Sequence, residues 1–328
     1  MTVATTANKA GTSAGIGSRL ADPDPVARQL ALVELAEGNE EAPVETLLAV
    51  LEDPDALVRK LAVGVLEELG EARAIPGIVE RLLDTDADVR ETAAAALREF
   101  RGADAATALL ASVAHRESEV RRSVIVALRE LRDPRATAPL IAALADASAA
   151  VRREAVVSLA YLRAPDAVDA LRARLGDEDE SVRRVAVGAL AHFNGPALLE
   201  DFTRALADAD WRVRMEAAIV LGRAALAGAV PALRRALTDP YWQVQKEAIA
   251  ALGRLRAAAA VPELIAALAS PTPDLRRAAA YALGDIGARS AAPALGRLAA
   301  DPDVEVRKAA ARALAAFAAE HEPTPKDN

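Results

Sequence analysis

The chain has 328 residues, a formal net charge of −8 and no cysteine. Without cysteine it can form neither disulfides nor thiolate metal sites, and it has no cysteine nucleophile. Its acidic balance is the opposite of that expected for a protein that holds a phosphate backbone. Ala and Leu dominate and aromatic residues make up only 3%, which favours an all-α protein with closely packed helices.

The first residues are small and polar and lack the apolar stretch of a signal peptide. No segment is long and apolar enough to span a bilayer. Ile16 and Leu20 fall at the spacing of later helices, so we predict that residues 1–19 form a flexible tail or a frayed half-repeat. We expect a soluble, cytoplasmic protein that binds no membrane.

From residue 20 onward, one pattern recurs ten times with a period of 31 residues and no insertion. Its first column is basic in nine units and reads Arg28, Arg59, Arg90, Arg121, Arg152, Arg183, Arg214, Gln245, Arg276 and Arg307. Seven residues later a leucine stands in every unit, from Leu35 to Leu314. A tandem array in which each unit packs on its neighbours follows from this regularity.

The first helix of each unit surrounds the arginine column. The residue before Arg, an Ala three residues after it and the Leu form one apolar stripe at helical spacing. Six residues before Arg stands an acid in eight units, which we predict to be the helix N-cap: Asp22, Asp53, Asp84, Asp146, Asp177, Asp208, Asp239 and Asp301. Proline often follows it (Pro23 and Pro54, for example), and we expect these prolines at the first helical position.

The second helix carries two apolar columns four residues apart, such as Leu47 with Leu51 and Leu264 with Leu268. Proline marks its start in several units, for example Pro76 and Pro262. Short connections join the two helices, so each unit is an antiparallel helical hairpin.

The segment Asp301–Leu314 reads DPDVEVRKAAARAL and Ala260–Leu268 reads AVPELIAAL. This pattern resembles the HEAT-like repeats of the phycobilisome-lyase type over residues 20–317. The resemblance implies a single right-handed α-solenoid whose first helices line the concave wall. The end of the chain is polar and contains Pro323 and Pro325, so we predict a disordered tail over 318–328. It is specific for the fold and says little about function, because such repeats serve many roles.

Side chains that differ between repeats are the natural binding residues of such a surface. Three residues before the arginine column most units have a small or turn-forming residue, but two adjacent units have Trp211 and Trp242, the only tryptophans of the chain. Tyr241 adjoins the second. Exposed aromatic side chains at helix starts are costly unless they bind something, and Trp and Tyr are frequent hot-spot residues. The alternative is that they pack against the neighbouring unit's loop.

The column after Arg is basic in seven of ten units and includes Arg122, Arg153, Arg184 and Lys246, with Met215 among them. We expect this row to face an acidic and apolar partner surface. Alternatively, it is a solvated helix face paired with nearby acids such as Glu154, Glu216 and Glu247. The arginine column itself is expected to form a structural ladder with cap aspartates or loop carbonyls. Gln245 interrupts that ladder beside Tyr241.

Catalytic readings find little support in these residues. The histidines His115, His192 and His321 are far apart, and the single His-Glu pair, His321-Glu322, lies in the tail, unlike the helix-borne pairs of the HEAT-repeat iron enzyme deoxyhypusine hydroxylase. Nucleotide-binding and nucleophile motifs are missing. The aromatic pair resembles the concave face of HEAT-like DNA glycosylases, but the acidic total argues against nucleic acid.

We therefore expect a non-catalytic scaffold or assembly chaperone that binds another protein, with no cofactor or metal. The expected binding residues are Trp211, Trp242, Tyr241, Met215, Arg122, Arg153, Arg184, Lys246 and Gln245. The alternative is a phycobilin lyase-like protein that handles a pigment, in which aromatic side chains stack on the rings and arginines pair with the propionates.

Overall fold

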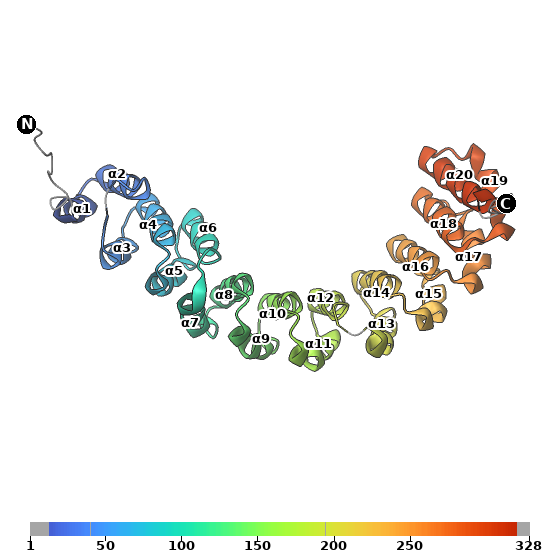
Figure 1. Cartoon of the computed structure of the whole chain (residues 1–328), viewed down its shortest axis with the longest axis horizontal. Coiled ribbons are helices and arrows are strands. Elements are labelled where there is room, and N and C mark those ends of the chain that lie inside the picture. Colours follow the sequence, from blue (N-terminus) through green and yellow to red (C-terminus); the bar gives the residue numbers. More distant parts are fainter. Residues whose placement is uncertain (1–12, 40, 194, 320–328) are drawn as a thin grey trace, which may run out of the picture. The chain divides into compact units, whose positions relative to one another are not determined.

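The computed structural model describes residues 13–39, 41–193 and 195–319, and within these ranges the chain forms 20 α-helices and no strands (Figure 1). The first helices are α2 (Pro25–Ala36), α4 (Ala56–Leu69), α6 (Ala87–Ala96), α8 (Ser118–Leu131), α10 (Ala149–Leu162), α12 (Glu180–Leu190), α14 (Trp211–Arg223), α16 (Trp242–Arg254), α18 (Pro273–Ile286) and α20 (Val304–Ala319). The second helices are α3 (Val44–Val50), α5 (Ile75–Arg81), α7 (Gly102–Ser112), α9 (Thr137–Ala143), α11 (Val168–Ala173), α13 (Leu199–Ala205), α15 (Val230–Ala236), α17 (Val261–Ala267) and α19 (Ala292–Arg297). The predicted repeat of two helices is confirmed.

The helix α1 (Ser13–Leu20) precedes the first repeat and buries Ile16 and Leu20, at the spacing that the sequence indicated. Of the tails predicted at residues 1–19 and 318–328, residues 1–12 and 320–328 lie outside the described residues. Residues 318 and 319 belong to the last helix, so the second tail was predicted to start two residues too early. No helix of the described ranges has both the length and the apolar character needed to cross a membrane.

The chain forms two compact units, residues 1–164 and 165–328. Unit 1 contains α1 to α10, and unit 2 contains α11 to α20. Within each unit the first helices form one layer and the second helices form the other (Figure 1). In unit 2 the layer made by α14, α16, α18 and α20 follows the inner side of the bend, as the family resemblance implied.

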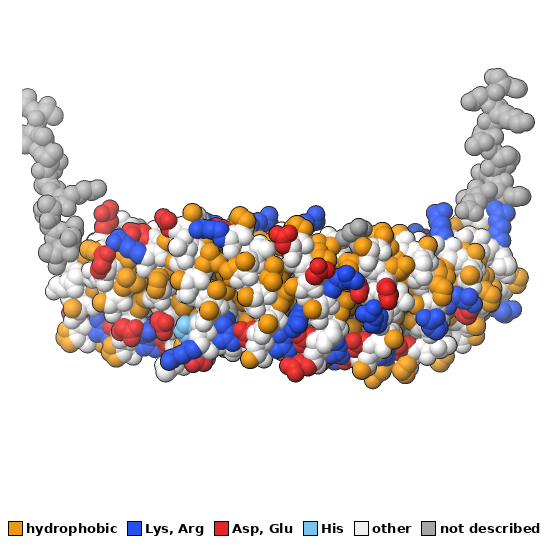
Figure 2. Space-filling view, turned by 90° about the horizontal axis from the view of Figure 1, so that it is seen from below, with side chains coloured by type: hydrophobic (Ala, Val, Ile, Leu, Met, Phe, Trp, Pro, Cys, Tyr) orange, Lys and Arg blue, Asp and Glu red, His pale blue; other side chains and the backbone are white. Residues whose placement is uncertain are grey.

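The core lies between these two layers. In the second repeat Val58, Ala62 and Leu66 form the predicted apolar stripe and are fully buried, as is Ile78 of the following second helix. The other side of the second helices is visible in Figure 2, where hydrophobic side chains cover much of the surface and acidic and basic groups are intermixed. The apolar columns that recur in the sequence are thus the side chains that fill the core between the two helix layers.

The helix caps differ from the prediction. The N-cap of α4 is Asp55, whose carboxylate accepts from the backbone N–H of Val58, and not Asp53 two residues earlier. The same shift places the caps of α2, α6, α12 and α14 at Asp24, Asp86, Asp179 and Asp210. Pro54 consequently lies before the cap and not at the first helical position. The N-cap assignment from sequence was wrong for these five helices because each of their repeats starts with two acids, either of which can cap a helix.

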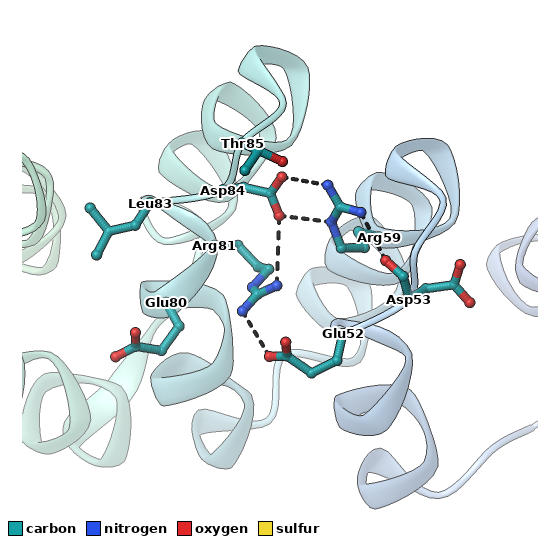
Figure 3. Close-up of a pocket in the computed structure, with 8 residues that line it drawn as sticks. All are labelled: Glu52, Asp53, Arg59, Glu80, Arg81, Leu83, Asp84 and Thr85. Carbon is teal, nitrogen blue, oxygen red and sulfur yellow. Dashed lines mark hydrogen bonds and ion pairs between the residues drawn. The ribbon is translucent and has the colours of Figure 1, made fainter.

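The earlier acid has another partner, the arginine of the preceding repeat. Nε and Nη2 of Arg59 donate to the two carboxylate oxygens of Asp84 at 2.8 and 2.6 Å, and its Nη1 donates to the carbonyl of Asp53 at 2.8 Å (Figure 3). Equivalent pairs between neighbouring repeats join Arg28 to Asp53, Arg121 to Asp146, Arg183 to Asp208, Arg214 to Asp239 and Arg276 to Asp301. The predicted arginine ladder is confirmed, and its rungs link consecutive repeats.

A hollow of about 370 Å³ lies beside this rung, and Figure 3 shows the residues that line it. Arg81 crosses it from α5 and pairs with Glu52 at 2.7 Å, while its Nη1 lies 3.6 Å from Asp84. Because the cations that line it already have carboxylate partners, this hollow belongs to the stacking of the repeats.

In unit 2 the first helices approach each other closely through glycine. A Cβ built on Gly222 of α14 would lie 2.8 Å from the Cα of Ala251, and one on Gly253 would lie 2.8 Å from the Cα of Ala282. Neither position has room for a methyl group without displacing backbone. The inner layer of this unit is therefore held at short spacing by glycine facing alanine.

Candidate partner-binding surface

A stacked pair of aromatic rings joins the seventh and eighth repeats. Trp211, the first residue of α14, stacks on Tyr241 with ring centroids 5.5 Å apart and an interplanar angle of 12°. We expected two tryptophans side by side, but the ring that meets Trp211 belongs to Tyr241. The predicted alternative, packing against the neighbouring loop, thus holds for Trp211, which is half-buried.

Tyr241 occupies the N-cap position of α16, where the corresponding residues of α14 and α12 are capping aspartates. Its side chain makes no capping hydrogen bond. Loss of such a cap costs about 0.5–2 kcal/mol, and an aromatic pair returns about 0.5–1.5 kcal/mol. The chain has exchanged a helix cap for an aromatic stack at this one position.

Trp242, the first residue of α16, follows directly and is 40% exposed, and Tyr241 is 45% exposed. Among the described residues Trp242 takes part in no ring stack. An indole that is 40% exposed on a helix in the interior of the repeat array leaves apolar surface available for contact with a partner. We call Trp211, Tyr241 and Trp242 the aromatic platform.

Two guanidinium groups flank the platform. Arg212 lies over the ring of Trp211 at 5.0 Å from its centroid, and Arg214 lies 5.7 Å from the centroid of Tyr241. Arg214 is also a rung of the ladder, since its Nε and Nη2 donate to Asp239 at 2.6 and 2.9 Å. Burial alone would raise the pKa of Asp239, but the hydrogen bonds from Arg214 and from the N–H of Tyr241 lower it. Arg214 thus connects the ladder to the ring of Tyr241, and Arg212 is exposed where it lies over the ring of Trp211.

The expected basic row is largely paired within its own helices. Arg122 lies 3.0 Å from Glu119, Arg153 lies 3.4 Å from Glu154, and Lys246 lies 3.4 Å from Glu247. Arg122 and Arg153 belong to unit 1, and Arg184 and Lys246 belong to unit 2, so the row is divided between the two units. These ion pairs favour the alternative reading of a solvated face with compensated charge.

Met215 and Arg184 lie on the same face of unit 2, both half-buried. Burial raises the pKa of the nearby Glu216; Arg184 and Arg223 oppose this rise and Glu247 adds to it. The partly buried carboxyl group of Glu216 therefore lies among the predicted binding residues of α14 and α16, next to Gly188 of α12.

Gln245 has a structural explanation. Its Nε2 donates to the carbonyl of Asp239 at 2.6 Å, as the arginines of the other repeats do. The next acid of the ladder is replaced at the same junction by Ser270, whose hydroxyl keeps the turn by accepting from the N–H of Thr272 at 3.2 Å. Gln245 replaces the arginine and Ser270 replaces the aspartate of the same rung, so no charge is left without a partner. The hypothesis that Gln245 marks a functional site therefore loses its main support.

A groove of about 410 Å³ lies between α16 and α18 on the same face, with Tyr281 and Arg277 in its wall. Arg312 lies over the ring of Tyr281 at 5.7 Å. Lys246, Arg254 and Arg277 line the groove together with Glu247, Asp274 and Asp285, so the charges of the two signs are balanced.

Sequence reasoning missed Arg212 and Glu216 as parts of this surface. Arg212 was detectable, since it is the one basic residue in its column of the repeat. The pairing of Trp211 with Tyr241 was not detectable, because it depends on the path of the loop before α16.

His192 is exposed, and within the described residues no group of three or more His, Cys, Asp or Glu side chains could hold a metal ion.

Comparisons with known proteins agree with this architecture. The family model for HEAT repeats matches residues 13–98, 75–153, 137–214, 199–281 and 261–326. No curated protein matches the chain.

Similar solved structures include an engineered protein that is 23% identical, with a TM-score of 0.51 over 93% of this chain and 98% of that one. YIBA_ECOLI is 20% identical, with a TM-score of 0.52 over 84% and 92%. Kap95p, in a structure titled for its binding to RanGDP, is 15% identical, with a TM-score of 0.63 over 93% of this chain and 50% of Kap95p. At these identities the likeness extends to the fold.

The repeat matches cover nearly the whole chain and coincide with the helical hairpins and the arginine ladder described above. The protein belongs to the HEAT repeat family.

Proposed function

We propose that this protein is a non-catalytic scaffold or assembly chaperone of the cytoplasm that binds another protein through the first-helix face of unit 2, centred on the aromatic platform. The observation that carries the proposal is the exchange of a helix cap for the stack of Trp211 on Tyr241, with Trp242 left 40% exposed beside it. Large aromatic side chains of this kind are the commonest energetic centres of protein interfaces.

The chemistry of the platform defines the expected partner. Apolar rings meet the guanidinium of Arg212, so a partner segment with an apolar or aromatic side chain next to an acid would fit both. Kap95p offers a parallel, since its structure is titled for binding to RanGDP and it shares this fold. The predicted roles of Met215, Arg184 and Lys246 remain part of the proposal as the surroundings of the platform.

The test compares Trp242→Ala with wild type in a quantitative pull-down from the native source. Tyr281→Ala is the matched control, because Tyr281 is an equally exposed aromatic residue on α18 of the same face. We expect Trp242→Ala to lose the partner that wild type and Tyr281→Ala retain, with circular dichroism unchanged for all three. Equal recovery by all three proteins would refute the platform as the binding site.

A second candidate, a phycobilin lyase-like protein that handles a pigment, is favoured by one observation: Arg212 lies over the ring of Trp211 next to the stack, where it would pair with a propionate. A titration with bilin followed by visible absorbance tests this reading. A red-shifted band that Trp211→Ala abolishes would support it, and an unchanged spectrum would exclude it.

A further inference from the structure

The arginine ladder is interrupted once within each unit, in two different ways. In unit 2, Gln245 and Ser270 replace both members of a rung, so no charge is left over. In unit 1, at the junction of the third and fourth repeats, only the acid is replaced, by His115, while Arg90 remains. The second interruption leaves a cation without its usual carboxylate.

Arg90 is held in the same way as the arginines that have a partner. Its Nη1 donates to the carbonyls of Asp84 at 2.7 Å and Thr85 at 3.0 Å, as the Nη1 of Arg59 donates to those of Asp53 and Pro54. Within the described part of the chain, the Nε and Nη2 atoms of Arg90 have no hydrogen-bond partner, and the residue is exposed. The guanidinium is therefore positioned, and its carboxylate-binding edge is open.

His115 cannot supply the missing acceptor. Its Nδ1 accepts from the N–H of Glu117 at 3.1 Å, which preserves the turn that aspartate makes elsewhere. A neutral imidazole that accepts at Nδ1 carries its proton on Nε2, which is then a donor. That Nε2 lies 3.8 Å from Glu80, and it cannot accept from Arg90.

We propose that the open edge of Arg90 binds a carboxylate side chain, Asp or Glu, of a partner polypeptide, which takes the place of the missing rung. The chain itself shows what this guanidinium geometry binds, since at other junctions the equivalent Nε and Nη2 hold both oxygens of one carboxylate, at 2.7 Å each for Arg121 and Asp146. The proposal rests on the proposed function in requiring a protein partner. It concerns unit 1 and does not involve the aromatic platform.

The test follows the Nε–Hε resonance of Arg90 by NMR, assigned with Arg90→Gln, while a short peptide with one glutamate is titrated in. The peptide with glutamine in its place, at matched ionic strength, is the control ligand. We expect the glutamate peptide to shift this resonance and to bind at least about fivefold more tightly than the glutamine peptide. Equal responses to the two peptides, or an equal response to inorganic phosphate, would overturn the assignment to a carboxylate.

Two variants taken from the chain's own repeats sharpen the test. His115→Asp installs the acid found at the other junctions and should abolish the response, because Arg90 is then paired internally. His115→Ser copies Ser270, keeps the turn acceptor without a carboxylate, and should retain the response. A response that survives in His115→Asp would refute the site. Because Arg90 belongs to unit 1 and Trp242 to unit 2, Trp242→Ala should leave this titration unchanged, so failure here is distinguishable from failure of the platform.

Discussion

Arg59 and Asp84 form a bidentate ion pair across two repeats, with both side chains almost fully buried and 25 residues apart in sequence. The hydrogen bonds from Arg59 are the main cause of the lowered pKa of Asp84. Pairs of this kind connect the first helices of consecutive repeats in both units, so removing one partner should destabilise the protein.

Asp84→Ala should destabilise the protein by about 2–4 kcal/mol, because it leaves the guanidinium of Arg59 buried without its counter-ion. The double variant Arg59→Gln/Asp84→Ser copies the natural combination of Gln245 and Ser270, so it should cost less than Asp84→Ala alone. Urea unfolding followed by circular dichroism measures both. Glu45→Gln, which breaks an exposed ion pair with Arg73, serves as the control and should change little. A double variant less stable than Asp84→Ala would contradict this account of the rung.

Gly253→Ala should destabilise by about 1–3 kcal/mol despite the better helix propensity of alanine, because the new Cβ would lie 2.8 Å from the backbone of Ala282. Gly64→Ala in α4 is the matched control. A Cβ there meets nothing within 4 Å, so the same substitution should stabilise by about 0.5–1 kcal/mol. Thermal unfolding distinguishes the two, and equal effects would show that the close approach of α16 and α18 does not constrain the helices.

Glu216→Gln should stabilise the protein at pH 7.5 and make no difference near pH 4. Burial raises the pKa of Glu216 in the folded state, so ionisation is less favourable in the fold than in the unfolded chain. The resulting penalty is present above the raised folded pKa and disappears as the pH falls below the ordinary value of about 4.3. We expect a gain of less than about 1 kcal/mol, because Glu216 is only partly buried and solvent screens its charge.

Urea midpoints at the two pH values measure this effect, with Glu200→Gln as a control at an exposed acid on α13. A variant that is less stable than wild type at pH 7.5 would mean that pairing with Arg184 and Arg223 outweighs burial.

Tyr241→Asp should make the protein more stable or leave it equal, while weakening partner binding. The aspartate would restore the N-cap of α16, worth about 0.5–2 kcal/mol, and remove the ring on which Trp211 stacks. Because the only two tryptophans of the chain lie in the platform, acrylamide quenching of their fluorescence reports the opening of the stack directly. A strong loss of stability would show that Tyr241 is a structural residue and not one kept for binding.

The repeat and its two helices are predictable from the sequence because the columns at Val58, Ala62 and Leu66 recur with helical spacing in every unit. The caps were misplaced because Asp53 and Asp55 are both suitable cap residues, and only the arginine of the preceding repeat determines that the first acid is used elsewhere. Pairing between repeats is a tertiary contact that a single repeat does not encode.

The candidate surface was predictable in part. Trp211, Tyr241 and Trp242 are conspicuous because other repeats have small or capping residues there. The stack between Trp211 and Tyr241 depends on the path of the loop, and the pairing of Arg122 and Arg153 with their own helices' acids depends on rotamers. Neither follows from residue spacing.

The central claim is that the aromatic platform binds a protein partner, and the most direct test is the affinity of that partner once the pull-down with the wild-type protein has identified it. Titration of the purified partner against wild type should give tight binding, with Trp242→Ala weakened at least about thirtyfold, as for a hot-spot residue, and Tyr281→Ala unchanged. An affinity that is the same for Trp242→Ala and wild type would contradict the claim.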